Sequence, residues 1–454
     1  MPNPVDDAPA APGEIVLPCD PVPDPGLGAR LRTFRRRVLY VSVVCFALAL
    51  VVLWEHPPTA KRPIEELADG LANIAEDPRL EPYQTLENAE YCAEWELGSH
   101  GNASVSFELP TDADLLFFLS RGPSSGHINV IKGAETGPVQ VNVTALYDDT
   151  EDLERTKVCR MGYAQEHGIL IWAEPRHPHG DPRHDVQPTI TVALPTNHSN
   201  FRDFTTDLAL FSHHFDSFWD FFSGISFMAI RLKTSNAPIR YLGLIARALF
   251  IQTSNANIQG LFVGTDVFMQ TSNAPIKLFA LLFGESVGAE SRAQIKTSNG
   301  AIETSLIMGS DYVDNVFRVL VETSAAPLTV NKPTGYGVDK RLSQMVESME
   351  YYNMSFFLDA STTLGPAIVK ISPEYEGTYD LQTTRSQAHV NETTDIHDPS
   401  GKGRHRTVNR TSEGGQQAEG FVYWSDDRDG EPPEGVARGA VKVTTTESPV
   451  TLYC

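Results

Sequence analysis

Basic residues are scarce in this sequence, and acidic residues outnumber them. The chain of 454 residues has 36 Lys and Arg against 58 Asp and Glu, which gives a net charge of −22 at pH 7. Binding to a nucleic-acid backbone requires clustered Lys and Arg, so this composition argues against nucleic acid as a partner. We expect the acidity to keep an extracellular surface soluble rather than to bind a particular cation.

Recognisable catalytic and metal-binding motifs are also scarce. The sequence has no H-E-x-x-H, no C-x-x-C and no phosphate-binding glycine loop. The densest group of possible metal ligands comprises His177, His179, Asp181, His184 and Asp185. Three prolines and a glycine among them predict a solvated hairpin loop rather than a metal site. We therefore predict no catalytic residue, no metal, no cofactor and no enzymatic activity.

Other candidate residues fit structural roles better than chemical ones. A polysaccharide lyase or hydrolase on a repeat scaffold needs paired carboxylates, and the tight pair among the repeats is Asp311 and Asp314, in a variable loop. Tyr351, Tyr352 and Trp424 could stack on sugar rings but are more often core residues. His213 and His214 stand between phenylalanines, which favours interfacial packing.

The longest uncharged apolar run, Val38–Trp54, covers 17 residues. A helix of this length reaches about 26 Å, close to the roughly 30 Å of a hydrocarbon core. Five arginines stand just before it, namely Arg30, Arg32, Arg35, Arg36 and Arg37. The positive-inside rule therefore predicts an uncleaved single-pass anchor with its N-terminus in the cytosol. The alternative is a cleaved signal peptide, in which a shorter region usually precedes the apolar run.

Six N-x-S/T sequons follow this run, at Asn102, Asn142, Asn197, Asn353, Asn391 and Asn409. Their position agrees with a glycosylated ectodomain at the cell surface or in the secretory pathway.

Cysteine positions fit the same topology. Cys19 precedes the run, Cys45 lies inside it, and Cys454 is the last residue. The remaining two, Cys92 and Cys159, fall in the first part of the ectodomain. In an oxidising compartment we predict that they form a disulfide, with two buried thiols as the alternative.

The chain divides into six regions by composition. Residues 1–37 predict a disordered cytoplasmic tail, 38–54 a transmembrane helix, and 55–88 a stalk with an amphipathic stretch at Ile64–Ala75. Residues 89–200 contain strand patterns that favour an antiparallel sandwich or the opening turns of a β-solenoid. Residues 201–230 form an aromatic connecting segment, in which we expect a short helix or a covering loop at Phe201–Gly224. Residues 231–454 form a repeat domain.

A short unit recurs in this last region. It is found as KTSNAPI from Lys233, QTSNANI from Gln252, QTSNAPI from Gln270, KTSNGAI from Lys296 and ETSAAPL from Glu322, with degenerate copies from Thr362, Thr383 and Thr445. Recurrence at such a period is typical of stacked supersecondary units. Each unit predicts a short strand, a Thr-Ser-Asn turn and a second strand.

Stacking of these units would align Asn236, Asn255, Asn273 and Asn299 at one corner. We predict a polar ladder in which each amide satisfies partly buried backbone groups. The alternative is a row of exposed Ser-Asn corners that binds a ligand.

At these residues the sequence resembles the repeats of putative-adhesin β-solenoid domains, which occur in bacterial cell-envelope proteins and in fungal proteins. The wider arrangement resembles a set of basidiomycete single-pass membrane proteins. It combines an N-terminal anchor, a Cys-containing β-region, TSNAPI-like turns, GKGR at Gly401–Arg404, VYW at Val422–Trp424 and a closing repeat at Ser448–Tyr453. The resemblance covers about residues 90–454, although the last three repeats depart from the consensus. It implies a β-solenoid and no defined activity.

The fold we predict is all-β. It is a β-solenoid or β-roll of TSNAPI-type repeats behind a sandwich-like or solenoid-initiating region, with one N-terminal transmembrane helix. The function we predict is that of a non-catalytic, membrane-anchored surface or secretory-pathway glycoprotein, which contacts cell-wall polysaccharide or a surface protein through an adhesin-like ectodomain. The alternative is a carbohydrate-active enzyme, a polysaccharide lyase or hydrolase, on the same scaffold.

Overall fold

The structure, a computed structural model, describes residues 77–174, 186–198, 200–218, 224–310, 312–331, 354–393, 396–426 and 438–454. The chain has two compact units, Met1–Lys61 and Arg62–Cys454, and every described residue belongs to the second. The predicted cytoplasmic tail and the apolar run Val38–Trp54 therefore lie outside the described part. Within that part, none of the helices has the length and apolar character needed to cross a membrane.

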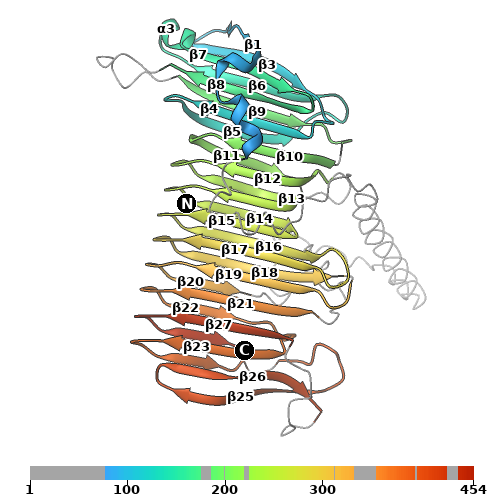
Figure 1. The fold of residues 1–454 in the computed structure, drawn as a ribbon, viewed down its shortest axis with the longest axis vertical. Helices are drawn as coiled ribbons and strands as arrows, with labels where there is room; N and C mark the ends of the chain where they lie inside the picture. Colours follow the sequence, from blue (N-terminus) through green and yellow to red (C-terminus); the bar gives the residue numbers. More distant parts are fainter. Residues whose placement is uncertain are drawn as a thin grey trace, which may run out of the picture. The chain divides into compact units, whose positions relative to one another are not determined.

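The described chain is built almost entirely of strands, which confirms the all-β prediction (Figure 1). The strands form two sheets that we call sheet A and sheet B. In spatial order, sheet A contains β1 (Ala89–Ala93), β7 (Thr156–Tyr163), β8 (Glu166–Ala173), β4 (Leu115–Arg121), β10 (Asn200–Asp207), β12 (Ser226–Lys233), the second half of β13 (Ile239–Gln252), β15 (Asp266–Thr271), β17 (Glu290–Thr297), β19 (Val316–Glu322), β21 (Ser355–Thr362), β27 (Gly439–Thr445), β23 (Gly377–Thr383), β26 (Gln417–Ser425) and β25 (His405–Gly414).

Sheet B is arranged in the same way. Its spatial order is β2 (Glu96–Leu97), β3 (Asn102–Leu109), β6 (Val139–Leu146), β9 (Gln187–Leu194), β5 (Ser125–Lys132), β11 (Leu210–Ser217), the first half of β13, β14 (Ile258–Gly264), β16 (Ile276–Gly284), β18 (Ile302–Ser310), β20 (Leu328–Asn331), β22 (Ala367–Lys370), β28 (Val450–Tyr453) and β24 (Ala388–Asn391). β13 runs from sheet B into sheet A and so joins the two.

We call one sheet A strand, the turn that follows it and the next sheet B strand a coil, and we call that turn the corner. From β12 and β13 onward the coils stack in parallel, and equivalent repeat positions pair. Ile239 pairs with Ile258, which in turn pairs with Ile276. Parallel strands with apolar residues on alternate positions bury one face of each sheet against the other.

One hydrophobic core runs through all the coils. It extends from Val105 near the start of the β-region to Cys454, so residues 89–200 and the repeats share it. Tyr241 is 2% exposed inside this core, and its ring lies where a Cβ at Gly260 would stand, 2.2 Å away. A side chain at Gly260 would therefore displace the Tyr241 ring.

The last part of the predicted stalk is folded against sheet A. The 3-10 helix η2 (Pro78–Tyr83) contributes Leu80 and Tyr83 to a second apolar cluster with Phe117 of β4, and Leu86 of the next 3-10 helix, η3 (Leu86–Asn88), packs against this cluster. Tyr83 stacks on Phe117 with ring centroids 4.4 Å apart. The stalk expected over 55–88 therefore ends in a packed segment, because its apolar side chains pack on apolar side chains of the outer face of sheet A.

The expectation of a helix or covering loop at Phe201–Gly224 is wrong, because this segment contains β10 and β11. Phe204, Phe211 and Phe215 are fully buried, and the Phe204 and Phe215 rings lie edge to face at 5.6 Å. Aromatic side chains favour strands when one face of the strand is buried. The high aromatic content of this segment fills the core where the parallel stack begins.

The last repeat of the chain does not lie at the end of the stack. β27 pairs with β21 on one side and with β23 on the other, and β28 pairs with β22 and with β24. The final coil is therefore inserted between two coils that precede it in sequence. Beyond it, β26 pairs with β23 in antiparallel orientation, and β25 follows.

A short helix, α3 (Thr150–Glu154), lies before β7.

Candidate functional site

Buried threonines connect the coils at the corner. In each copy the first threonine of the T-x-x unit is at most 7% exposed. The hydroxyl of Thr445 donates to the Ser448 carbonyl of its own corner, and the hydroxyls of the other seven donate to a backbone carbonyl of the adjacent coil. The bonds are Thr234 to Ala209 (3.0 Å), Thr253 to Ser235 (3.1 Å), Thr271 to Ser254 (3.3 Å), Thr297 to Ala274 (3.3 Å), Thr323 to Gly300 (3.0 Å), Thr362 to Ala326 (3.1 Å) and Thr383 to Ser448 (3.2 Å). These hydroxyls, rather than asparagine amides, satisfy the buried carbonyls.

The asparagines form a separate, exposed ladder. Asn255 donates to Asn236, Asn273 to Asn255 and Asn299 to Asn273, each over 2.6 Å between Nδ2 and Oδ1. The amides therefore stack at one corner and bond to each other; that they also satisfy partly buried backbone groups stays a prediction. The sequence held a signal for the threonines, because threonine persists in the degenerate copies where asparagine is lost.

A groove of about 430 Å³ lies beside the corner. It crosses the ends of β15, β17, β19, β21 and β27 and is lined by Gln270, Thr271, Lys296, Thr297, Ser298, Glu322, Thr323, Ser324, Ser361, Thr362, Thr363, Thr444 and Thr446. Hydroxyl groups dominate this lining. Those of Thr271, Thr297, Thr323 and Thr362 are buried and donate to backbone carbonyls, whereas the others belong to half-buried or exposed residues, namely Ser298, Ser324, Ser361, Thr363, Thr444 and Thr446. A hydroxyl can both donate and accept a hydrogen bond. Neighbouring strands place them at intervals of about 4.8 Å. Such a row suits an extended ligand that carries many hydroxyls.

The charges in the groove neutralise each other. Lys296 Nζ lies 2.7 Å from Glu322 Oε2, and both side chains are more than a third exposed. A solvated pair of this kind contributes little to stability, so both groups can rearrange around a ligand at small cost. The groove therefore offers hydrogen bonds without a net charge.

A pair of carboxyls with little exposure lies elsewhere: Asp266 begins β15, and Glu285 lies in the turn between β16 and β17. Burial, together with the nearby Glu285, raises the pKa of Asp266 to about 7. Burial also raises the pKa of Glu285, whose carboxylate is 3.1 Å from Arg247 Nη2. Asp266 is 5% exposed, so a substrate could not reach it without rearrangement. The pair comes from separate turns, which is why the sequence did not indicate it.

A G-x-S-x-G pattern spans Gly122–Gly126. A catalytic serine in this pattern stands between a strand and a helix. Here the pattern joins β4 to β5, and Ser124 is 3% exposed. This context does not fit a nucleophile.

His213 occupies the core, in agreement with its predicted packing role. Its Nδ1 donates to the Phe211 carbonyl (3.0 Å), and its Nε2 accepts from the Thr206 hydroxyl (2.8 Å). Burial lowers the pKa of His213 to about 4. Its neighbour His214 is exposed and lies 3.4 Å from Asp216.

The GKGR and VYW segments meet at the C-terminal end of the stack. Trp424 is 3% exposed and donates from Nε1 to the Pro373 carbonyl over 2.8 Å. Arg404 lies over its ring at 5.8 Å and pairs with Asp398 at 3.1 Å. Trp424 is therefore a packing residue rather than a sugar platform.

Several predicted candidates lie outside the described residues. They are His177, His179, Asp181, His184, Asp185, Asp311, Tyr351, Tyr352 and Asn353. Asp314 is described and is exposed. Among the described residues, no group of three or more His, Cys, Asp or Glu is arranged to hold a metal ion.

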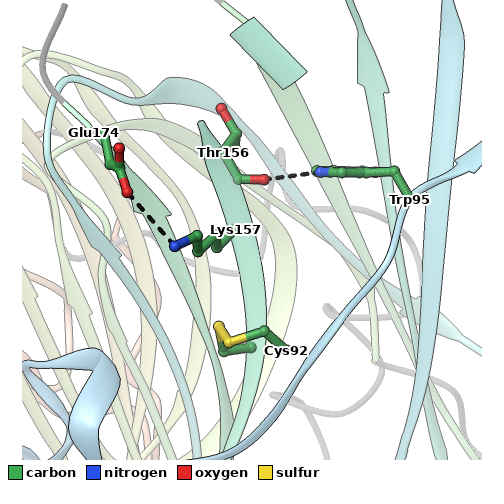
Figure 2. Close-up of a disulfide and its surroundings, with 6 residues drawn as sticks. Cys92, Trp95, Thr156, Lys157 and Glu174 are labelled. Atoms are coloured by element: carbon green, nitrogen blue, oxygen red, sulfur yellow. Dashed lines mark hydrogen bonds and ion pairs between the residues drawn. A yellow bond between two sulfur atoms is a disulfide. The ribbon is translucent and has the colours of Figure 1, made fainter. Parts of the chain in front are cut away.

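Cys92 and Cys159 are joined in a disulfide between β1 and β7 (Figure 2). Close by, Trp95 donates from its indole to the Thr156 carbonyl over 2.8 Å. Lys157 forms an ion pair with Glu174 at 3.5 Å. The disulfide and the Trp95 bond fasten β1, a strand at the edge of sheet A, to β7, and the ion pair joins β7 to the end of β8.

The five sequon asparagines within the described ranges are all exposed. They are Asn102, Asn142, Asn197, Asn391 and Asn409. No described sequon asparagine lines the groove. Glycans at these positions would therefore leave the groove open.

Comparison with known proteins yields distant structural similarity. No family model matches the sequence, and no curated protein matches it. A putative adhesin from Bacteroides fragilis is similar with a TM-score of 0.30 and 8% identity, over 78% of this chain and 98% of that one. A putative adhesin from Parabacteroides merdae has a TM-score of 0.32 and 11% identity, over 60% and 90%. A putative cell adhesion protein from Clostridium sporogenes has a TM-score of 0.17 and 7% identity, over 78% and 99%. Similarities of this size carry no argument about function.

Proposed function

We propose that this protein is a non-catalytic surface or secretory-pathway protein whose stacked coils form a β-solenoid that binds glycan. The observation that carries the proposal is the hydroxyl-lined groove across β15, β17, β19, β21 and β27. Its repeated donors and acceptors match a polymer with regularly spaced hydroxyls, such as a cell-wall polysaccharide. A single-pass anchor at Val38–Trp54 would hold the ectodomain outside the cytosol.

Binding to wall polysaccharides tests this function. The full chain in detergent micelles would be applied to a polysaccharide array, and reducing-sugar release would be measured on the same polymers. We expect binding without release. Release that exceeds a heat-treated control would favour the carbohydrate-active enzyme, and binding to surface proteins alone would favour a protein partner.

Variants that fill the groove locate the binding site. Ser298 and Ser324 are exposed serines of the groove, so Ser298→Trp and Ser324→Trp should block it without disturbing the core. The matched controls are Ser106→Trp and Ser412→Trp, at exposed serines of β3 and β25. We expect at least a tenfold loss of affinity in the groove variants. Equal affinity in both sets would refute the groove as the site.

Topology is tested separately. A tag before residue 30 should be protected from protease in sealed microsomes, and Asn102 and Asn142 should acquire N-glycans. A soluble, secreted product that lacks glycans at both positions would contradict the anchor.

A further inference from the structure

The C-terminal end of the stack places one strand of each sheet at an edge. Among the described strands, β25 of sheet A pairs with β26 alone, and β24 of sheet B pairs with β28 alone (Figure 1). An edge strand presents backbone N–H and C=O groups with which a strand of another molecule can pair. A second copy of this chain could therefore add to the sheets at this end.

The edge strand β25 differs from the edge strands at the other end of the stack. There, β1 and β2 are five and two residues long, and the pairing of β1 is irregular between Ala89 and Tyr91. Short or irregular edges are poor templates for pairing. β25 is ten residues long, and it keeps a regular register with β26 over His405–Arg410. It contains neither Lys nor Pro, two residues that commonly protect an edge, so another kind of protection is needed.

Both edge strands of the C-terminal end carry a glycosylation sequon. Asn409 lies within β25, and Asn391 is the last residue of β24. The preceding residues, Val408 and Val390, pack against or within the main core. Alternation along a strand therefore directs both asparagines to the outer faces, where they are exposed. A glycan on either one can extend beside the edge without disturbing the core.

We propose that N-glycans on Asn391 and Asn409 cap this end of the stack and keep β24 and β25 from pairing with a second copy of the chain. Two copies paired through β25 about a two-fold axis perpendicular to the sheet would have their outer faces on the same side. Opposite side chains in such a pair have Cβ atoms about 5 Å apart. A branched glycan is much bulkier than this spacing, and the second copy brings its own glycan to the same surface. The inference rests on the secretory location in the proposed function and is independent of the groove.

The sequon at Asn142 provides a matched comparison. Asn142 is exposed on β6, which pairs with β3 on one side and with β9 on the other. Its neighbours in register are Ser106 and Thr191, whose small side chains leave room for a glycan. Loss of this glycan opens no edge, because both sides of β6 are already paired.

Self-association tests the cap. The full chain is produced in a glycosylating eukaryotic host, held in detergent micelles and examined by sedimentation equilibrium. We expect Asn391→Gln/Asn409→Gln to self-associate at least tenfold more tightly than the wild type, and the control Asn142→Gln/Asn197→Gln to behave like the wild type. Endoglycosidase trimming of folded wild-type protein should have the same effect as the edge variant, which covers the case of a variant that folds poorly. Equal self-association of all these samples would overturn the proposal.

Two further measurements locate the contact and check the modification. Amide hydrogen exchange over His405–Arg410 should slow severalfold when the edge variant associates, and association without this change would overturn pairing through β25. Mass spectrometry of the wild type should find glycans on Asn391 and Asn409. If these two are unmodified while Asn102 and Asn142 carry glycans, the cap is refuted and the secretory location stands. If all four are unmodified, the secretory location fails as well.

Discussion

At the scale of single residues, His213 shows how burial controls charge. The folded state keeps this imidazole neutral, because its pKa falls to about 4 from an ordinary value of 6.5. A group with a depressed pKa in the folded state binds its proton more readily after unfolding. The contribution of the neutral His213 to the free energy of unfolding is therefore fully present above pH 6.5 and is lost as pH falls toward 4.

Acidification should destabilise the wild-type chain through His213. Between pH 7.5 and pH 5 we expect a loss of about 2 kcal/mol from this residue. Asp266 acts in the opposite direction, because its pKa is raised to about 7 and its protonation relieves a buried charge as pH falls. The measurement is therefore a difference: urea melts of His213→Leu at both pH values should lack the loss that the wild type shows. His214→Gln, at the exposed neighbour, should melt like the wild type.

At the scale of structural elements, each corner combines a buried threonine hydrogen bond with exposed hydrogen bonds between asparagines. Removing the one or the other should lower the stability of the protein by different amounts. Thr253→Val removes a hydrogen bond from a residue that is 3% exposed, at an expected cost of about 1 kcal/mol. Asn255→Leu removes two amide bonds, whereas Asn236→Leu removes one. Thermal melts should rank Asn255→Leu below Asn236→Leu in midpoint. The exposed corner residue Ser254→Ala is the control, and equal midpoints for all four variants would contradict this account.

The disulfide of β1 is a second test at this scale. Cys92 and Cys159 are separated by 67 residues, and closing such a loop is worth about 4 kcal/mol in the chain-entropy model. We expect Cys92→Ser/Cys159→Ser to unfold at lower urea, with the first loss of protection in β1 and η2. Thiol labelling of native, unreduced protein should leave both cysteines unmodified. Quantitative labelling of the pair would refute the bridge.

Many of the strands and corners could be predicted from the sequence, because the local alternation of apolar and polar residues determines where they form. The strand patterns in 89–200 and the corners of the repeat follow from side-chain periodicity and turn chemistry. The sequence of β10 and β11 does not distinguish strands from a helix or covering loop, because a dense run of aromatic residues can form either a cover or a core. The Asp266–Glu285 pair could not be found, since its members approach only after the coils stack.

At the scale of the whole molecule, the order of the coils is not the order of the sequence. The order of the repeats in the sequence predicts that the last one stacks after the coil of β23 and β24. Each copy of the repeat specifies its own strands and its own corner, but it does not specify which coils it pairs with. The structure places β27 between β21 and β23. Pairing on both sides of the last coil decides its position, and that information lies in side-chain fit between distant segments.

Deletion of residues 438–454 tests this arrangement. We expect the truncated chain to lose protease resistance over β23–β26, because the coil that joins them to β21 and β22 is missing. Addition of a synthetic 438–454 peptide should restore a protected fragment of wild-type size. A peptide with Val441→Asp and Val443→Asp, at positions buried in the core, is the control and should fail. Full protease resistance without any peptide would contradict the insertion.

The inserted coil also has a consequence for biosynthesis. A nascent chain presents β23–β26 before their neighbour in the stack has been translated, so these strands must wait beside an open sheet edge. Unpaired edges of this kind are what chaperones retain and what aggregates recruit. Any chain interrupted before residue 438 keeps that edge open permanently. The pairing of β27 and β28 with β23 and β24 therefore limits the time for which that edge stays open to the interval between the synthesis of the two segments.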